Sequence, residues 1–135
     1  MSIYMDKARA FRAAPPHTYN CAQSVVMSFA EAAGIDEKTA YRFAAGFGGG
    51  MKRGSTCGAV IGGIMALGLF GISDGETIGW YHSQIMEKYG NCLDCKELLR
   101  INAEAGLEKK PHCDGIVYFC AGLVEQILKE RRLME

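Results

Sequence analysis

The longest uncharged stretch of the chain spans residues 54 to 73 and shapes the predicted fold. It reads GSTCGAVIGGIMALGLFGIS and contains six glycines. Its length alone would admit a transmembrane helix, but so many glycines weaken a lipid-facing span. A helix that is apolar all round is also typical of the centre of a bundle. We therefore predict a buried glycine-rich central helix, in which Gly54, Gly58 and Gly62 form a face that a neighbouring backbone can approach closely.

Helical patterns also occupy the chain before this run. Residues 2–13 are weakly amphipathic, and we expect Pro15 and Pro16 to end that helix because proline lacks a backbone donor. Asn20 is a good N-cap for the next segment, CAQSVVMSFAEAAG, and Gly34 suits its C-terminal end.

A third helix and a glycine loop complete the first half of the chain. Asp36 is placed to cap the segment EKTAYRFAAGF, which has a helical pattern. Residues 46–54 then carry glycines that suit a loop with positive φ angles.

The second half continues with helices. Asp74 and Glu76 begin an amphipathic stretch that Gly90 ends, and CLDCKELLR is predicted to form one or two helical turns. The segment NAEAGLEKKPHC is predicted to be a polar connection to a last helix, DGIVYFCAGLVEQILKERR. No segment clearly alternates with period two. We predict an all-α compact bundle of about five to seven helices in one domain, residues 1–135.

The net charge and the N-terminal sequence argue against some classes of function. Fifteen basic and fifteen acidic residues give a formal net charge of zero, so no global field attracts nucleic acid. The first 17 residues mix charges and prolines and do not resemble a signal peptide. We predict a cytoplasmic protein that binds no nucleic acid and has no membrane span; the identity of any protein partner and the formation of a homo-oligomer are left open.

The six cysteines of the chain are its main candidates for functional residues. Cytoplasmic thiols are kept reduced, which favours metal binding or transient redox chemistry over structural disulfides. Cys57 follows the glycine loop at the expected start of the central helix, with Lys52 and Arg53 close in sequence. A helix N-terminus and cationic neighbours favour the thiolate, so we predict a reactive Cys57.

The other cysteines give weaker patterns. Cys92 and Cys95 form a C-x-x-C pair, but neither a βαβ context nor a second close pair accompanies it. If Cys113 and Cys120 share the last helix, their α-carbons stand about 10 Å apart. A disulfide needs roughly 4.4 to 6.8 Å, which excludes a bond between them.

Four segments carry a family resemblance that spans nearly the whole chain: NCAQS, FGGGMKRGSTCGAVIGG, YGNCLDCKELL and HCDGIV. They resemble the C_GCAxxG_C_C family of putative redox-active proteins, whose label spells GCA where this chain reads Cys57-Gly58-Ala59. The resemblance implies redox activity and four family cysteines, which by order are Cys21, Cys57, Cys95 and Cys113. Cys92 and Cys120 are then extra, with Cys92 a candidate resolving thiol and Cys120 a core residue.

The leading hypothesis is a small redox protein in which Cys57 is the nucleophile or electron-relay ligand and Cys95 or Cys113 resolves it. The alternative is a metal-binding module in which Cys21, Cys57, Cys95 and Cys113 hold zinc or an iron–sulfur cluster.

Other readings stay open beside these two. His17 and His112 are candidates to complete a mixed metal site. A helical interaction or cofactor-binding domain with incidental cysteines is the third class. The glycine loop lacks the Walker and G-x-G-x-x-G patterns, so nucleotide binding has little support, and whether the protein is an enzyme is left open.

Overall fold

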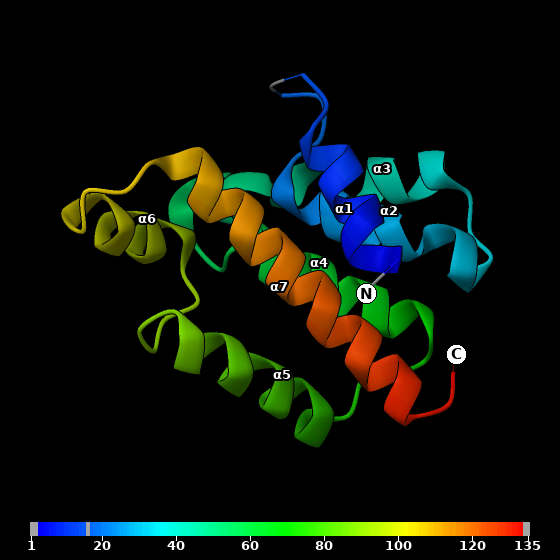
Figure 1. The fold of residues 1–135 in the computed structure, drawn as a ribbon. Helices are drawn as coiled ribbons and strands as arrows, with labels where there is room; N and C mark the ends of the chain where they lie inside the picture. The colour runs from blue at the N-terminus through cyan, green and yellow to red at the C-terminus, as the bar shows by residue number, and fades with distance from the viewer. Residues whose placement is uncertain (1–2, 16, 134–135) are drawn as a thin grey trace.

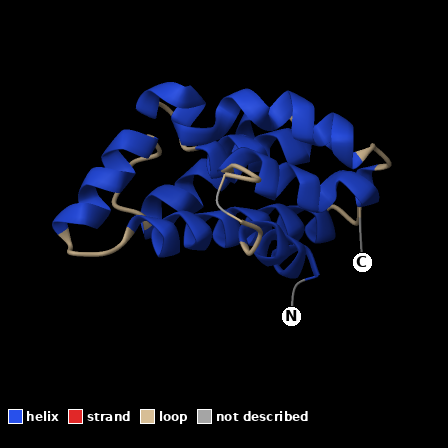
Figure 2. Cartoon of the chain, turned by 90° about the horizontal axis from the view of Figure 1, so that it is seen from above, coloured by secondary structure: helices blue, strands red, loops and turns tan. Residues whose placement is uncertain are grey.

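The computed structural model describes residues 3–15 and 17–133, and Pro16, one of the two expected helix-ending prolines, lies outside them. The fold is all-α, as predicted, and the described residues form seven α-helices without a strand (Figures 1 and 2). In chain order the elements are α1 (Ile3–Arg12), α2 (Cys21–Ala33), α3 (Glu37–Ala44), η1 (Ala45–Phe47), η2 (Gly50–Gly54), α4 (Gly58–Leu69), α5 (Gly75–Lys88), α6 (Cys95–Glu104) and α7 (Lys109–Glu130).

Helix α2 has the predicted ends. The Asn20 side chain accepts a hydrogen bond from the Gln23 N–H at 2.7 Å, and the Gln23 side chain accepts one from the Asn20 N–H at 2.8 Å. This capping box satisfies two N–H groups that the helix would otherwise leave unpaired. Gly34 ends the helix in the left-handed region at φ 77°. The start of α2, and with it Cys21, is therefore fixed by local hydrogen bonds.

Helix α4 starts later than the uncharged run. The glycine-rich segment before it does not join the helix, because Gly54 has a φ of 72° and the Ser55 N–H bonds back to the Gly50 carbonyl at 2.9 Å. Cys57 is the N-cap of α4, and its backbone is extended rather than helical at ψ 134°. The prediction that Gly54 shares a helix face with Gly58 and Gly62 is therefore wrong.

Gly58 and Gly62 do make the close approach that their spacing predicts. A Cβ on Gly62 would lie 2.7 Å from the Ala22 carbonyl oxygen, and one on Gly58 would lie 2.8 Å from the Phe47 carbonyl oxygen. Any side chain at either position would force backbones apart. Helix α4 therefore packs directly on the α2 backbone, and most of its residues are buried.

The last two helices are longer than the sequence pattern predicts. The segment expected to be a polar connection is mostly helical, since α6 runs to Glu104 and α7 begins at Lys109. Pro111 lies in the first turn of α7, where its missing N–H breaks no intrahelical bond. Cys113 and Cys120 consequently both lie in α7, the arrangement that excludes a disulfide between them.

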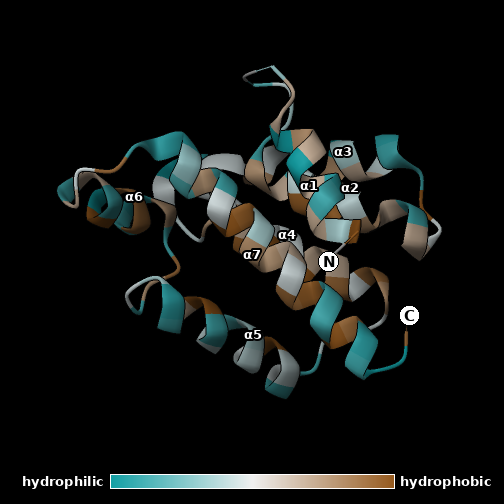
Figure 3. Cartoon of the chain, in the orientation of Figure 1, coloured by the Kyte–Doolittle hydropathy of each residue, from teal (hydrophilic) through white to brown (hydrophobic). Residues whose placement is uncertain are grey.

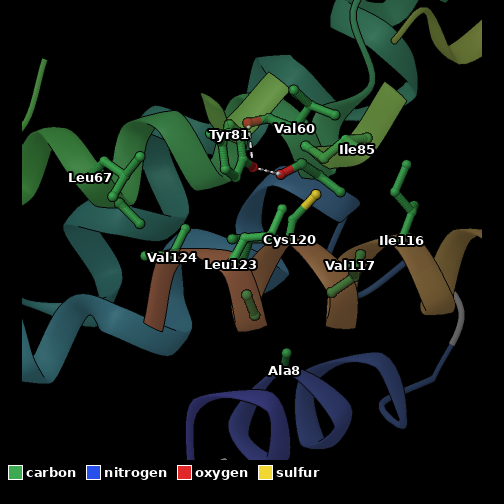
Figure 4. Packing of buried hydrophobic residues seen from close by; sticks show 14 of the residues in the cluster. Ala8, Val60, Leu67, Tyr81, Ile85, Ile116, Val117, Cys120, Leu123 and Val124 are labelled. Carbon is green, nitrogen blue, oxygen red and sulfur yellow. Dashed lines mark hydrogen bonds between the residues drawn. The ribbon is translucent and has the colours of Figure 1, made fainter. Parts of the chain in front are cut away.

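The main core forms where α7 packs against α1, α2, α4 and α5. Apolar residues follow the middle of α7, while polar residues follow its ends (Figure 3). Tyr81 from α5 is fully buried and donates a hydrogen bond to the Val60 carbonyl at 3.0 Å, close to Cys120 (Figure 4). Cys120 is fully buried, as expected for a core residue.

No helix in the two described ranges has both the length and the apolar character needed to cross a membrane.

The contact between Gly63 and Tyr81 yields a stability prediction. A Cβ on Gly63 would overlap the Tyr81 hydroxyl, which is buried and bonded to Val60. We expect Gly63→Ala to lower the free energy of unfolding by about 1–3 kcal/mol, the usual cost of overpacking. Urea denaturation measures this change.

Gly68→Ala is the matched control, since Gly68 lies in the same helix and a Cβ there meets nothing within 4 Å. Alanine should stabilise α4 by about 1 kcal/mol at that position through helix propensity. Equal effects of the two substitutions would contradict the packing described here.

Candidate functional site

A cavity of about 960 Å³ lies where the starts of four helices meet the chain between α1 and α2. The four cysteines singled out by the family resemblance all line it: Cys21, Cys57, Cys95 and Cys113. They come from α2, the N-cap of α4, α6 and α7 respectively. Thiols that are up to 92 residues apart in sequence (113 − 21) thus share one space.

Cys21 and Cys113 interact directly across the cavity. The Cys113 side chain is hydrogen-bonded to Cys21 and lowers the pKa of Cys21, although burial acts in the opposite direction. Arg12 favours the Cys21 thiolate as well. The same pairing raises the pKa of Cys113 well above its ordinary value, so Cys21 is the thiol of the pair that loses its proton first.

Arg12 is held beside these thiols by a network that ties α1 to α7. Its Nε donates to the Asp114 carboxylate at 2.8 Å, and its Nη1 donates to the Tyr19 carbonyl at 3.2 Å. Lys110 bonds the other Asp114 oxygen at 2.9 Å. Arg12 and Asp114 were missed by sequence reasoning, and at a sequence separation of 102 no local pattern links the pair.

Cys57 and Cys95 are brought together by a short antiparallel bridge. The Cys57 N–H donates to the Leu93 carbonyl and the Cys95 N–H to the Ser55 carbonyl, both at 2.7 Å, around the bridge between Thr56 and Asp94. Side chains alternate across such a ladder, so Cys57 and Cys95 lie on the same face of it. That face is the one that lines the cavity.

The bridge does not make Cys57 the most acidic thiol. Burial raises the pKa of Cys57 to about 11, and the N–H groups of Ala59 and Val60 at the start of α4 only partly oppose this. Cys57 is 6% exposed. The helix start favours the Cys57 thiolate, as the sequence predicts, but desolvation acts against it and has the larger effect.

The glycine loop contains a strained left-handed turn. Four successive residues, Gly49 to Lys52, have φ angles between 59° and 65°. This region suits glycine but costs energy at Met51 and Lys52. Gly50 cannot be replaced without collision, because its Cβ would lie 2.7 Å from the Cys95 Cβ. The turn packs on Cys95 and brings Lys52 to the cavity.

Cys92 and Cys120 lie apart from this cavity. Neither is among its lining residues, although both belong to the described chain. The Cys92 thiol lies 3.9 Å from the Tyr89 carbonyl, and burial raises its pKa. The C-x-x-C spacing therefore does not bring Cys92 into the cavity beside Cys95; Cys95 shares that space with cysteines distant in sequence.

The donor geometry does not favour a metal centre. Within residues 3–15 and 17–133, no three His, Cys, Asp or Glu side chains converge closely enough to hold a metal ion. His17 and His112 both line the cavity, but they complete no such group. The four cysteines surround a space and do not form the compact set that zinc or an iron–sulfur cluster requires.

Comparison with known proteins agrees with the cysteine pattern. A family model described as "Putative redox-active protein (C_GCAxxG_C_C)" matches residues 19–127, which include all six cysteines. Neither the curated proteins nor the solved structures gave a match. Because the matched range covers most of the sequence, the chain belongs to the C_GCAxxG_C_C family, whose description names redox activity.

Proposed function

We propose that this protein performs thiol–disulfide exchange, with Cys21 as the attacking thiolate and Cys113 as the resolving thiol. The observation that carries the proposal is the contact between these two thiols, which lowers the pKa of Cys21. The thiolate is the nucleophilic form of cysteine, and exchange requires a second thiol within reach of the first. The cytoplasmic prediction fits a cycle that starts from reduced thiols.

The proposed cycle has two displacement steps. The Cys21 thiolate attacks one sulfur of a disulfide RS–SR, forming a mixed disulfide with RS and releasing RS⁻, which takes up a proton. Cys113 then loses its proton to solvent and attacks the Cys21 sulfur, which releases the second RS⁻ and leaves a Cys21–Cys113 disulfide. Two electrons pass from the two cysteines to the substrate disulfide. An external dithiol supplies the two electrons that complete the cycle.

The state of each thiol supports the order of these steps. Cys113 has a raised pKa while Cys21 is charged. Conversion of the Cys21 thiolate to a mixed disulfide removes that neighbouring charge, which makes Cys113 easier to deprotonate. Lys109 also favours the Cys113 thiolate. The resolving thiol is therefore activated only after the first attack.

Cys57 and Cys95 form a second dithiol in the same cavity. The sequence hypothesis made Cys57 the nucleophile, but its burial and its pKa of about 11 favour a later role. Burial also raises the pKa of Cys95. We assign this pair to the transfer of oxidation away from the Cys21–Cys113 disulfide. Cys57 and Cys95 supply two electrons and form a disulfide, which returns the first pair to its reduced state, and the external dithiol then reduces the Cys57–Cys95 disulfide.

The contact between Cys21 and Cys113 predicts a pH effect on alkylation. Iodoacetamide labelling of Cys21, followed by mass spectrometry across pH, should reach half its maximal rate below the pH of an ordinary cysteine. Cys113→Ala removes the hydrogen bond to the thiolate, so the midpoint should rise towards that of an ordinary cysteine. The labelling rate below that midpoint should fall as a result.

Cys113→Ser is the matched control because its hydroxyl still donates a hydrogen bond but forms no disulfide. It should keep the low labelling midpoint. Identical midpoints in the alanine variant and the unaltered protein would contradict the assigned activation of Cys21.

The proposed cycle also predicts which cysteines become linked first. Reduced protein treated with one equivalent of a small disulfide, and quenched before oxidation passes to Cys57 and Cys95, should yield a Cys21–Cys113 peptide pair on mass mapping. Cys57→Ser should leave this first product and its rate within about twofold, since serine is a good N-cap for α4.

In the same reaction with a small disulfide, the fast phase is the initial loss of free thiols. Cys21→Ser should abolish this phase. Should the fast phase vanish in Cys57→Ser and persist in Cys21→Ser, Cys57 would be the nucleophile and the assignment of Cys21 would be wrong.

A further inference from the structure

The cavity that contains the four cysteines has a strongly one-sided charge. Five cationic side chains line it, and none of its described lining residues is an aspartate or a glutamate. The cationic residues are Arg12, Lys52, Lys96, Lys109 and Lys110. The chain as a whole has a net charge of zero, so the positive charge here is a local arrangement.

Three of these cations form no ion pair with a carboxylate of the described residues. Arg12 and Lys110 both pair with Asp114. Lys52, Lys96 and Lys109 take part in none of the ion pairs found between described residues. Lys109 is close enough to Cys95 and Cys113 to influence both thiols. A cavity lined by one sign of charge focuses the field and attracts ions of opposite sign.

Backbone dipoles add to this field. Cys21, Cys95 and Lys109 are the first residues of α2, α6 and α7, and Cys57 is the N-cap of α4. Four helix N-termini therefore end at the cavity that the lysines line. Each carries partial positive charge that favours an anion nearby.

Lys52 is kept at the cavity in an unfavourable conformation. Its φ of 59° is one that glycine would adopt at lower cost, and glycines occupy the two positions before Met51. Strained residues of this kind persist where the surroundings hold them, and they concentrate at functional sites. The turn thus holds Lys52 among the residues that line the cavity.

We propose that the cavity recognises small disulfides that carry carboxylate groups, which Lys52, Lys96 and Lys109 bind while Cys21 attacks the disulfide bond. This inference rests on the proposed function and names its substrate class. The volume of about 960 Å³ lies in the range of small-molecule sites. The products are two anionic thiols and the Cys21–Cys113 disulfide, by the two displacements described above.

The test compares three small disulfides that differ in charge. Reduced full-length protein is mixed with 3,3′-dithiodipropionate (anionic), 2-hydroxyethyl disulfide (neutral) or cystamine (cationic), and loss of the Cys21 thiol is followed by rapid quenching and mass spectrometry. Each rate is divided by the rate of 2-mercaptoethanol with the same disulfide, which removes differences in intrinsic reactivity. We expect the anionic disulfide to exceed the cationic one by about tenfold or more at low salt. The difference should shrink in 0.5 M salt because screening shortens the range of the field.

Charge-reversal variants locate the effect. Lys96→Glu and Lys109→Glu should each reduce the ratio of the anionic rate to the neutral rate by about threefold or more. This ratio cancels any change in the fraction of Cys21 thiolate, because both disulfides react with the same thiolate. Lys38→Glu is the matched control: Lys38 is exposed on α3, is not among the lining residues, and its substitution changes the net charge equally.

Lys52→Gly distinguishes a role of Lys52 in binding the anionic disulfide from a role in the stability of the fold. Glycine relieves the left-handed strain, so the urea midpoint should rise while the preference for the anionic disulfide falls. A purely structural role for Lys52 would leave that preference unchanged.

The outcomes distinguish this inference from the function on which it rests. Reaction of Cys21 with all three disulfides at equal normalised rates, or equal effects of Lys96→Glu and Lys38→Glu, would overturn the charge-based recognition and leave thiol–disulfide exchange standing. Failure of Cys21 to react with any of the three would overturn the exchange itself.

Discussion

The contact of Gly58 with the start of α2 is the constraint on which the site depends. A Cβ on Gly58 would lie 2.8 Å from the Phe47 carbonyl, 3.3 Å from the Ala22 nitrogen and 3.4 Å from the Cys21 Cβ. Two helix starts can approach this closely only when one of them presents no side chain. The glycine that follows Cys57 thus brings Cys57 and Cys21 to one cavity, and a bulkier residue would separate the two thiol-bearing ends.

The chain between α3 and α4 is then held from both sides. The Asn20 side-chain amide donates to the Ala45 carbonyl at 3.0 Å, which ties η1 to the cap of α2. The paired hydrogen bonds around Thr56 and Asp94 tie the other end of the loop to α6. A strained turn at Met51 and Lys52 is sustainable because both of its flanks are fixed.

Much of the fold follows from local sequence signals, and most of the site does not. Asn20, Gly34 and Asp74 act at helix ends through hydrogen bonds or backbone angles that their residue types favour, so these ends could be predicted. The start of α7 was misjudged because a polar, exposed first turn has no hydrophobic period to reveal it. Whether Cys21 or Cys57 has the lower pKa depends on the burial of each thiol and on the Arg12–Asp114 pair. These follow from the packing of helices that are far apart in sequence, so local sequence signals do not predict them.

The charge of the cavity changes during the proposed cycle, and this affects its direction. In the reduced state, the Cys21 thiolate offsets one of the positive charges that surround it. Arg12 is one of these charges, and it lowers the pKa of Cys21. The Cys21–Cys113 disulfide is neutral, so the oxidised cavity is more positive by up to one unit. It should therefore hold the anionic thiol products more strongly than the reduced cavity holds them. Bound thiol is also the reactant of the reverse exchange, so removal of oxidation by Cys57 and Cys95 would favour the forward direction.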